Sequence, residues 1–481
     1  MKERNKSFFL ILLILVSFNL WGQKNLSADT AKSINVKPVV DLRVELLSIV
    51  FRLAGNPEYN SEDLKSYAAD INAHFNPYRT HPLITFAKQI AEEKGIRYDA
   101  VMFMAIHLKQ PPYLSPLVSF KQRVPEKRWK YEHAEKFVSL LQRFYREAKC
   151  EDFFNQHSPL YELAKSRFDN VFRKVDLNWY KAYYGKLPDA KFNVIIGLGN
   201  GGGNYGPHLV YPNGKEELYA ILGTWSIDSI GMPVYEEESF MPFIIHEYNH
   251  SFINQLVEEN ANQLEAPGKK IYNKVREQME SMAYGNSKTM IDESLVRAAV
   301  VRYMKNHGTD SAKVQDLIHS ERKSGFLWIE DVINVLEHYE SNRDKYPTLQ
   351  SFMPQIVKFY NQLALRIDSV KKHFEQNRPQ VVSIEPFENN AQGVDTSISE
   401  MVINFDKPLN PKHFSIRLSE GGQEQMPITD LIGFTNNNKS LRLKIALKPN
   451  HEYSFVLGSQ KFRTVDGYPL REYVVKFKTK K

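Results

Sequence analysis

The chain has 481 residues, of which 42% are hydrophobic and 25% are charged, and this ordinary globular composition is enough for two or three domains. Its 63 basic and 56 acidic residues give a net charge of +7 without a basic run interleaved with aromatic residues, so nucleic-acid binding is not indicated. Cys150 is the only cysteine, which excludes a disulfide within the chain, and we expect a partly buried, inert thiol.

The N-terminal residues have the pattern of an export signal. Three basic residues among the first six precede an apolar run from Phe8 to Phe18, which is shorter than the roughly 20 residues that span a membrane. We therefore predict a signal peptide over residues 1–22 and an exported protein, periplasmic or extracellular after cleavage. Residues 23–40 are polar and are predicted to be flexible, and no later segment predicts an integral membrane span.

Residues 41–185 have apolar side chains at helical spacing and predict a helical N-terminal region. Their aromatic residues also fall near this spacing, which indicates core packing rather than ligand stacking. Beyond an opening helix at Val44–Leu53, the expected helices cover residues 83–93, 100–108, 133–148 and 160–172.

A second region, residues 186–376, opens with a short β pattern at Phe192–Ile196 and the glycine-rich segment Gly197–Gly206. Three of these glycines have the spacing of a dinucleotide-binding fingerprint, which requires a helix directly afterwards. Pro207 and a second β pattern follow instead, so we exclude nucleotide binding. We expect a glycine-rich loop beside an edge strand, where the backbone of a peptide can approach closely.

The motif H-E-x-x-H follows at His246, Glu247 and His250, on an apolar background typical of a buried helix. Positions i and i+4 share one helix face, so the two imidazoles can converge on one metal ion, with Glu247 beside the open coordination position. Pro242 predicts that this helix begins near Ser239–Met241, because proline is tolerated in a first turn. The alternative is a core helix whose histidines are satisfied by hydrogen bonds.

A catalytic zinc usually has three protein ligands, so one more ligand is needed. Ile253 and Leu256 stand where the metzincin pattern has Gly and His, which excludes that class. A carboxylate from a second helix is the remaining common solution, and Glu293 is the best candidate, on a helix expected to open with a capping box at Thr289. The alternative for Glu293 is a solvated first-turn acid. Arg297, one turn later, could hold this carboxylate or bind an anionic group of a substrate.

Two more helical patterns end at a linker over residues 376–379, after which apolar residues alternate with a period of two. Short alternating runs separated by Pro, Asn and Gly predict about six strands and a small β-sandwich over residues 379–481. The helices are expected at residues 328–339 and 352–374, and the strands at residues 381–384, 400–405, 414–418, 440–445, 453–457 and 473–477.

The motif His246–His250 together with Asp292–Ala298 resembles the gluzincin class of zincin metallopeptidases. More closely, about residues 41–374 are similar to an uncharacterised bacterial family of secreted zincin-like proteins, and the tail, with Ile403–Pro408, resembles a bacterial Ig-like module. The expected fold class is α+β, with a mainly helical zincin-like catalytic region around a small mixed sheet, plus a C-terminal all-β Ig-like sandwich. The zincin-like core itself is expected over residues 186–376.

By this resemblance, His246, His250 and Glu293 would bind one Zn²⁺ per chain, and Glu247 would act as general base towards a water on that metal. Gluzincins also place a Tyr or His side chain that stabilises the oxyanion. No motif chooses among the candidates for that role, which are Tyr284, Tyr303, His307 and His208.

The function that the resemblance implies is a secreted zinc metallopeptidase, a hydrolase that acts on peptides or proteins. One alternative is a non-catalytic binding or adhesion protein that keeps a zincin scaffold and uses the glycine-rich groove and the Ig-like module. A weaker alternative is a zinc amidase that acts on cell-wall material. The intact Glu247 favours an enzyme, because a pure scaffold does not need the base. The Ig-like module could bind a protein or a cell-surface glycan.

Overall fold

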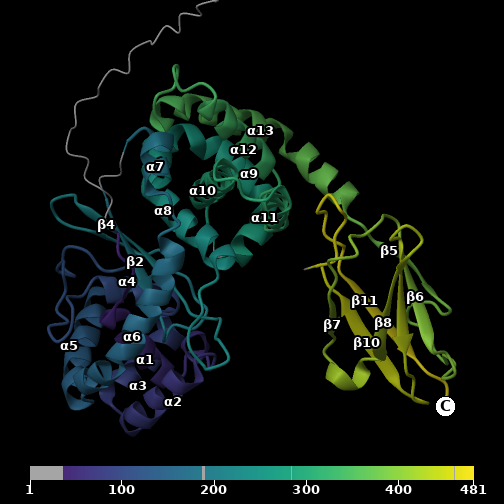
Figure 1. The fold of residues 1–481 in the computed structure, drawn as a ribbon, viewed down its shortest axis with the longest axis horizontal. Helices are drawn as coiled ribbons and strands as arrows, with labels where there is room; N and C mark the ends of the chain where they lie inside the picture. Colours follow the sequence, from purple (N-terminus) through teal and green to yellow (C-terminus); the bar gives the residue numbers. More distant parts are fainter. Residues whose placement is uncertain (1–35, 187–189, 283, 460) are drawn as a thin grey trace, which may run out of the picture. The chain divides into compact units, whose positions relative to one another are not determined.

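The structure is a computed structural model that describes residues 36–481, apart from residues 187–189, 283 and 460 (Figure 1). The predicted signal peptide and residues 23–35 of the predicted flexible segment lie outside the described residues. Across the described residues, no helix has both the length and the apolar character needed to cross a membrane. The helical region with a small sheet and the all-β region after it confirm the predicted fold class.

The N-terminal region is built on α1, in which eleven of the twelve residues are buried, so this helix is internal rather than amphipathic. The predicted start of α6 at residue 160 is wrong. The helix begins at Cys150 and continues through Pro159, because the buried residues on both sides of the proline hold it in the core. The helices are α1 (Leu42–Leu53), η1 (Pro57–Tyr59), α2 (Lys65–Phe75), η2 (Asn76–Tyr78), α3 (Pro82–Lys94), α4 (Asp99–Ile106), α5 (Tyr131–Glu147), α6 (Cys150–Phe172) and α7 (Leu177–Tyr184).

A mixed four-stranded sheet has the order β1-β2-β4-β3. It consists of β1 (Val39–Val40), β2 (Lys191–Ile196), β3 (His208–Val210) and β4 (Glu216–Leu222). The first three strands in this order are parallel, and β3 pairs antiparallel with β4 at the edge, beside the glycine-rich segment as predicted. Because Val39 and Val40 pair with Ile195 and Ile196, the prediction of a flexible segment up to residue 40 is wrong for these two residues.

The second helical group follows β4, and α10 is its central helix, in contact with α8, α9 and α12. The helix with the H-E-x-x-H motif begins at Glu237, two residues before the predicted range. The N-cap of α10 is Asn286, whose side chain accepts a hydrogen bond from the backbone N–H of Thr289 (2.9 Å), so the predicted capping box at Thr289 is wrong. The helices are α8 (Glu237–Glu259), α9 (Ala261–Ser281), α10 (Ser287–Asn306), α11 (Ser311–Lys323), α12 (Ile329–Glu340) and α13 (Leu349–Asn377).

The C-terminal module has two antiparallel sheets, with the orders β5-β6-β9-β8 and β11-β10-β7, around a buried apolar core. Six of its strands lie where the sequence predicts them, and β8 is an additional one. The strands are β5 (Val381–Glu385), β6 (Glu400–Phe405), β7 (Ile416–Leu418), β8 (Ile428–Thr435), β9 (Ser440–Ile445), β10 (Glu452–Leu457) and β11 (Tyr473–Lys478), with the short helix η3 (Gly422–Gln425) after β7.

Candidate functional site

Three side chains from α8 and α10 converge on one point. The Nε2 atoms of His246 and His250 lie 3.2 Å apart, and each lies 3.5 Å from a carboxylate oxygen of Glu293. A tetrahedral zinc site with bonds of about 2.0–2.1 Å places its ligand atoms about 3.3–3.4 Å from one another. Two imidazole nitrogens, each facing its own oxygen of the Glu293 carboxylate at nearly these separations, therefore fit a zinc ion.

The surroundings of His246 favour the protonation state that binds a metal. Burial lowers the pKa of His246 well below its ordinary value, and His250 and Arg297 act in the same direction. A neutral imidazole keeps a lone pair for a metal ion. Glu293 is only 7% exposed and lies in the second turn of α10, which contradicts the alternative of a solvated first-turn acid.

A network of side chains outside the three candidate ligands holds Glu293. The hydroxyl of Tyr284 donates a hydrogen bond to Oε2 of Glu293 (3.0 Å), and Nη2 of Arg297 donates to the same hydroxyl (2.8 Å). Arg297 also forms ion pairs with Glu293 (3.3 Å) and with Glu321 (2.5 Å). Among the predicted contacts, Tyr284 and Arg297 therefore orient the candidate ligand. Glu321 was not predicted, because it comes from α11, a helix that the sequence pattern did not indicate.

Asn254 supports His250 in a similar way. Its Oδ1 lies 2.9 Å from Nδ1 of His250, so an Nδ1–H donor leaves Nε2 of this imidazole free to face the cluster. Sequence reasoning did not single out Asn254, although its position four residues after His250 places both side chains on one helix face.

Glu247 lies against the glycine-rich loop. A Cβ atom added at Gly206 would lie 3.3 Å from Cδ of Glu247 and would collide with its Oε2, so a side chain here would displace this carboxylate from its position. Burial raises the pKa of Glu247 to about 7. A carboxylate with such a pKa can both accept and release a proton near neutral pH.

Glu45 fixes the other end of the same loop. This fully buried carboxylate on α1 accepts hydrogen bonds from the backbone N–H groups of Leu198 (2.8 Å) and Gly199 (3.1 Å) and from the hydroxyl of Tyr67 (2.9 Å). Burial raises the pKa of Glu45 to about 7. Sequence reasoning missed Glu45, and the available signal was an acidic residue within the otherwise apolar α1 pattern.

Three of the oxyanion candidates make their described contacts outside the cluster. Tyr303 lies ten residues after Glu293 on α10, which corresponds to about 15 Å along the helix axis. Its hydroxyl accepts a hydrogen bond from the backbone N–H of Asp176 (2.6 Å), and its ring stacks on His307 (centroids 3.9 Å apart). The His208 ring packs edge-on against Phe103 (5.4 Å) of α4. These contacts give Tyr303, His307 and His208 structural roles.

An apolar surface lies one turn before the candidate ligands. Phe243 on α8 is 42% exposed, and its ring lies 6.1 Å from that of Trp225, which itself stacks on Phe240 (4.2 Å). The apolar pattern of this helix predicts burial, but Phe243 is an exposed position in it. Its exposure beside Glu247 gives the site an apolar neighbour for a ligand.

Comparison with solved structures finds chains that match this one with low TM-scores. CopC from Methylosinus trichosporium OB3b matches with 17% identity over 21% of this chain and 94% of that chain, and a TM-score of 0.18. Domains 1–6 of the surface layer protein SbsC match with 15% identity over 50% of this chain and 33% of that chain, and a TM-score of 0.17. A comparison with curated proteins finds no match.

Comparison with protein families divides the chain in two. Residues 36–359, about two thirds of the chain, match the family described as "Domain of unknown function (DUF4932)", and residues 375–479 match the family described as "Bacterial Ig-like domain". The first match includes α1, the glycine-rich loop, α8 and α10, and thus every residue of the cluster. The protein therefore belongs to the DUF4932 family and carries a C-terminal bacterial Ig-like domain.

Proposed function

We propose that the protein is a zinc-dependent hydrolase in which His246, His250 and Glu293 hold one Zn²⁺ per chain. The observation that carries this proposal is the convergence of the three side chains. The two Nε2 atoms lie 3.2 Å apart and each lies 3.5 Å from one of the two Glu293 oxygens, close to the edges of a tetrahedral zinc site. A bound zinc ion would supply an activated water and polarise the bond to be cleaved.

Glu247 is the general base and acid of this proposal. Its carboxylate shares the helix with both histidines and is enclosed by the backbone at Gly206, which limits where it can move. It would accept a proton from the attacking water and return that proton to the leaving group. A binding scaffold without catalysis would need neither the carboxylate nor the glycine that makes room for it.

A peptide is the substrate that the surroundings of Glu247 favour. The chain from Tyr205 to Val210 forms the outer edge of the sheet, because β3 is the last strand in the order, and Gly206 within this segment lies against Glu247. An extended peptide that pairs with this edge would pass directly over the carboxylate. The exposed ring of Phe243 would accept an apolar side chain of such a peptide.

The proposed cellular location rests on the N-terminal sequence pattern, three basic residues followed by a short apolar run, which is typical of a signal peptide. Export would bring the enzyme to extracellular or periplasmic peptides. Amides of cell-wall material are the second substrate class to be assayed.

The experiment that tests this proposal is digestion of a peptide library by the zinc-loaded full-length protein and by a Glu247→Gln variant. We expect cleavage by the wild type and a fall of about 10²–10⁴-fold in the variant, with zinc content unchanged. Glu238→Gln, an exposed acid on the same helix, is the matched control and should cleave like the wild type. Equal rates for the wild type and the Glu247 variant would contradict the proposal.

A further inference from the structure

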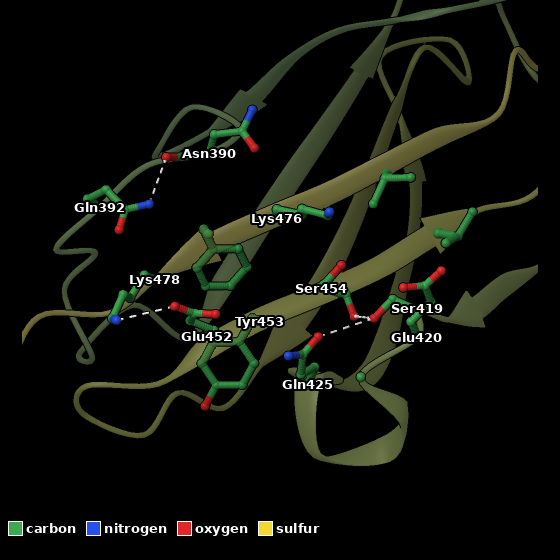
Figure 2. A pocket seen from close by; sticks show the side chains of 14 residues that line it. Asn390, Gln392, Ser419, Glu420, Gln425, Glu452, Tyr453, Ser454, Lys476 and Lys478 are labelled. Carbon is green, nitrogen blue, oxygen red and sulfur yellow. Dashed lines mark hydrogen bonds and ion pairs between the residues drawn. The ribbon is translucent and has the colours of Figure 1, made fainter.

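The Ig-like domain has a groove of about 780 Å³ on the outer face of its three-stranded sheet (Figure 2). Alternate residues of β10 and β11 form its floor, with Ser454 opposite Lys476 and Val456 opposite Val474. The residues between them point to the other side and build the core of the domain. The volume lies within the range of about 300–1,000 Å³ that small-molecule sites occupy.

Two segments rise beside this floor and make it concave. The segment with Asn390 and Gln392 runs along β11, where the backbone N–H of Asn390 donates to the carbonyl of Lys476 (2.7 Å). The segment with Ser419 and Gln425 lies beside β10, where the hydroxyl of Ser419 donates to the carbonyl of Ser454 (3.0 Å). Figure 2 shows these two groups of side chains on opposite sides of the floor.

The groove offers hydrogen-bonding groups that the described part of the chain leaves unused. The hydroxyl of Ser454, a residue that is only 7% exposed, has no hydrogen-bond partner among the described residues. The side-chain amide of Asn390 has no partner there either, and Gln425 uses only its oxygen, which accepts from Ser419 (3.4 Å). The amides of Asn390 and Gln425, on opposite sides of the floor, can therefore hydrogen-bond to a polar ligand in the groove.

The charges in the groove balance. Glu452 and Lys478 form an ion pair (3.2 Å), and Glu420 and Lys476 add one further charge of each sign, without an ion pair to any described residue. A net charge of zero does not select an anion or a cation. The ligand is therefore expected to be neutral and to carry many groups that both donate and accept hydrogen bonds.

We propose that this groove binds a neutral oligosaccharide. Sugar hydroxyls donate and accept at the same time, which suits carboxamides, carboxylates and hydroxyls placed side by side. The C–H faces of a sugar ring match Val456 and Val474 on the floor, where Val474 is 39% exposed. A protein partner is disfavoured, because the aromatic residues near the groove, Tyr453 and Phe477, are buried at 4% and 2% exposure and cannot act as anchors.

The test is calorimetric titration of the full-length protein with neutral tetrasaccharides of glucose, mannose, xylose and N-acetylglucosamine, and with tetragalacturonate as an anionic comparison. We expect saturable binding of at least one neutral tetrasaccharide, with an affinity that does not change between low and high salt. Gln392→Ala and Gln425→Ala should each weaken it by about two- to tenfold, the effect of one lost neutral hydrogen bond.

Gln423→Ala is the matched control, because this exposed glutamine belongs to the same short helix, η3, but does not line the groove. Thermal unfolding of each variant verifies that the domain remains folded. The proposal is overturned if no neutral tetrasaccharide binds, if only tetragalacturonate binds in a salt-dependent manner, or if the variant with both Gln392 and Gln425 replaced binds like the wild type. Loss of hydrolysis in the Glu247 variant does not bear on this outcome, so the two proposals are tested separately.

Discussion

Gly206→Ala should slow hydrolysis strongly while leaving the metal site intact. The added methyl group would lie 3.3 Å from Cδ of Glu247 and overlap Oε2, so the carboxylate has to move by roughly 1 Å. A displacement of that size costs about 10²-fold in rate, which corresponds to about 2.7 kcal/mol of activation free energy. His246, His250 and Glu293 do not contact the methyl group, so zinc content should remain one ion per chain.

The assay measures peptide hydrolysis, zinc content and thermal unfolding for Gly206→Ala and for Gly202→Ala. Gly202 belongs to the same loop, but a Cβ atom there would meet only Cβ of Trp225 at 3.6 Å, an ordinary contact, so this variant should keep its activity. Full activity of Gly206→Ala would refute the placement of Glu247 as the base. A parallel loss of activity in both variants would show that the loop, rather than the carboxylate, is affected.

Three further predictions concern the residues around the site and the core. Tyr284→Phe removes the hydrogen bond to Glu293, so zinc affinity in a chelator competition should fall about 10–100-fold, while turnover at saturating zinc stays near that of the wild type. Because burial raises the pKa of Glu45 to about 7, the folded protein keeps a proton that the unfolded chain releases above about pH 4.5. Wild-type stability should therefore fall between about pH 4.5 and 7 relative to Glu45→Gln, by up to on the order of 3 kcal/mol, measured by urea unfolding. Cys150 is buried, and burial raises the pKa of its thiol, so a thiol reagent should label it only after denaturation.

The fold class could be predicted because the apolar residues of most helices and strands recur with the period of that element. The alternating pattern of β6 is buried at every second residue, as the sequence indicates. β8 escaped prediction because two irregularities, between Ile428 and Asp430 and between Leu431 and Gly433, interrupt its alternation. α9 was not predicted because Pro267 and Gly268 stand inside it. A Cβ at Gly268 would lie 2.9 Å from Ile291 of α10, so glycine at this position lets the two helices approach closely.

The two histidine ligands could be predicted because their spacing places both side chains on one face of one helix. His246 and His250 follow from the i, i+4 rule, and Glu293 follows from a second helical pattern. Glu321 and Gly206 could not be predicted as partners of these residues, because only the tertiary fold brings α11 and the loop after β2 to α8 and α10. The same reason explains why the sequence offered Tyr303 and His307 as oxyanion candidates, although they lie about 15 Å or more along α10 from Glu293.

The most direct test of the central claim is the zinc affinity of the full-length wild type and of Glu293→Gln, measured by competition with a chelator. We predict one zinc ion per wild-type chain and, because a neutral amide oxygen is a poorer ligand than a carboxylate, a loss in the variant greater than about 100-fold. Excess zinc should then restore part of the hydrolysis in Glu293→Gln, but none in Glu247→Gln. A wild-type protein that takes up no zinc, or a Glu293→Gln variant that binds zinc as tightly as the wild type, would contradict the assignment of this site.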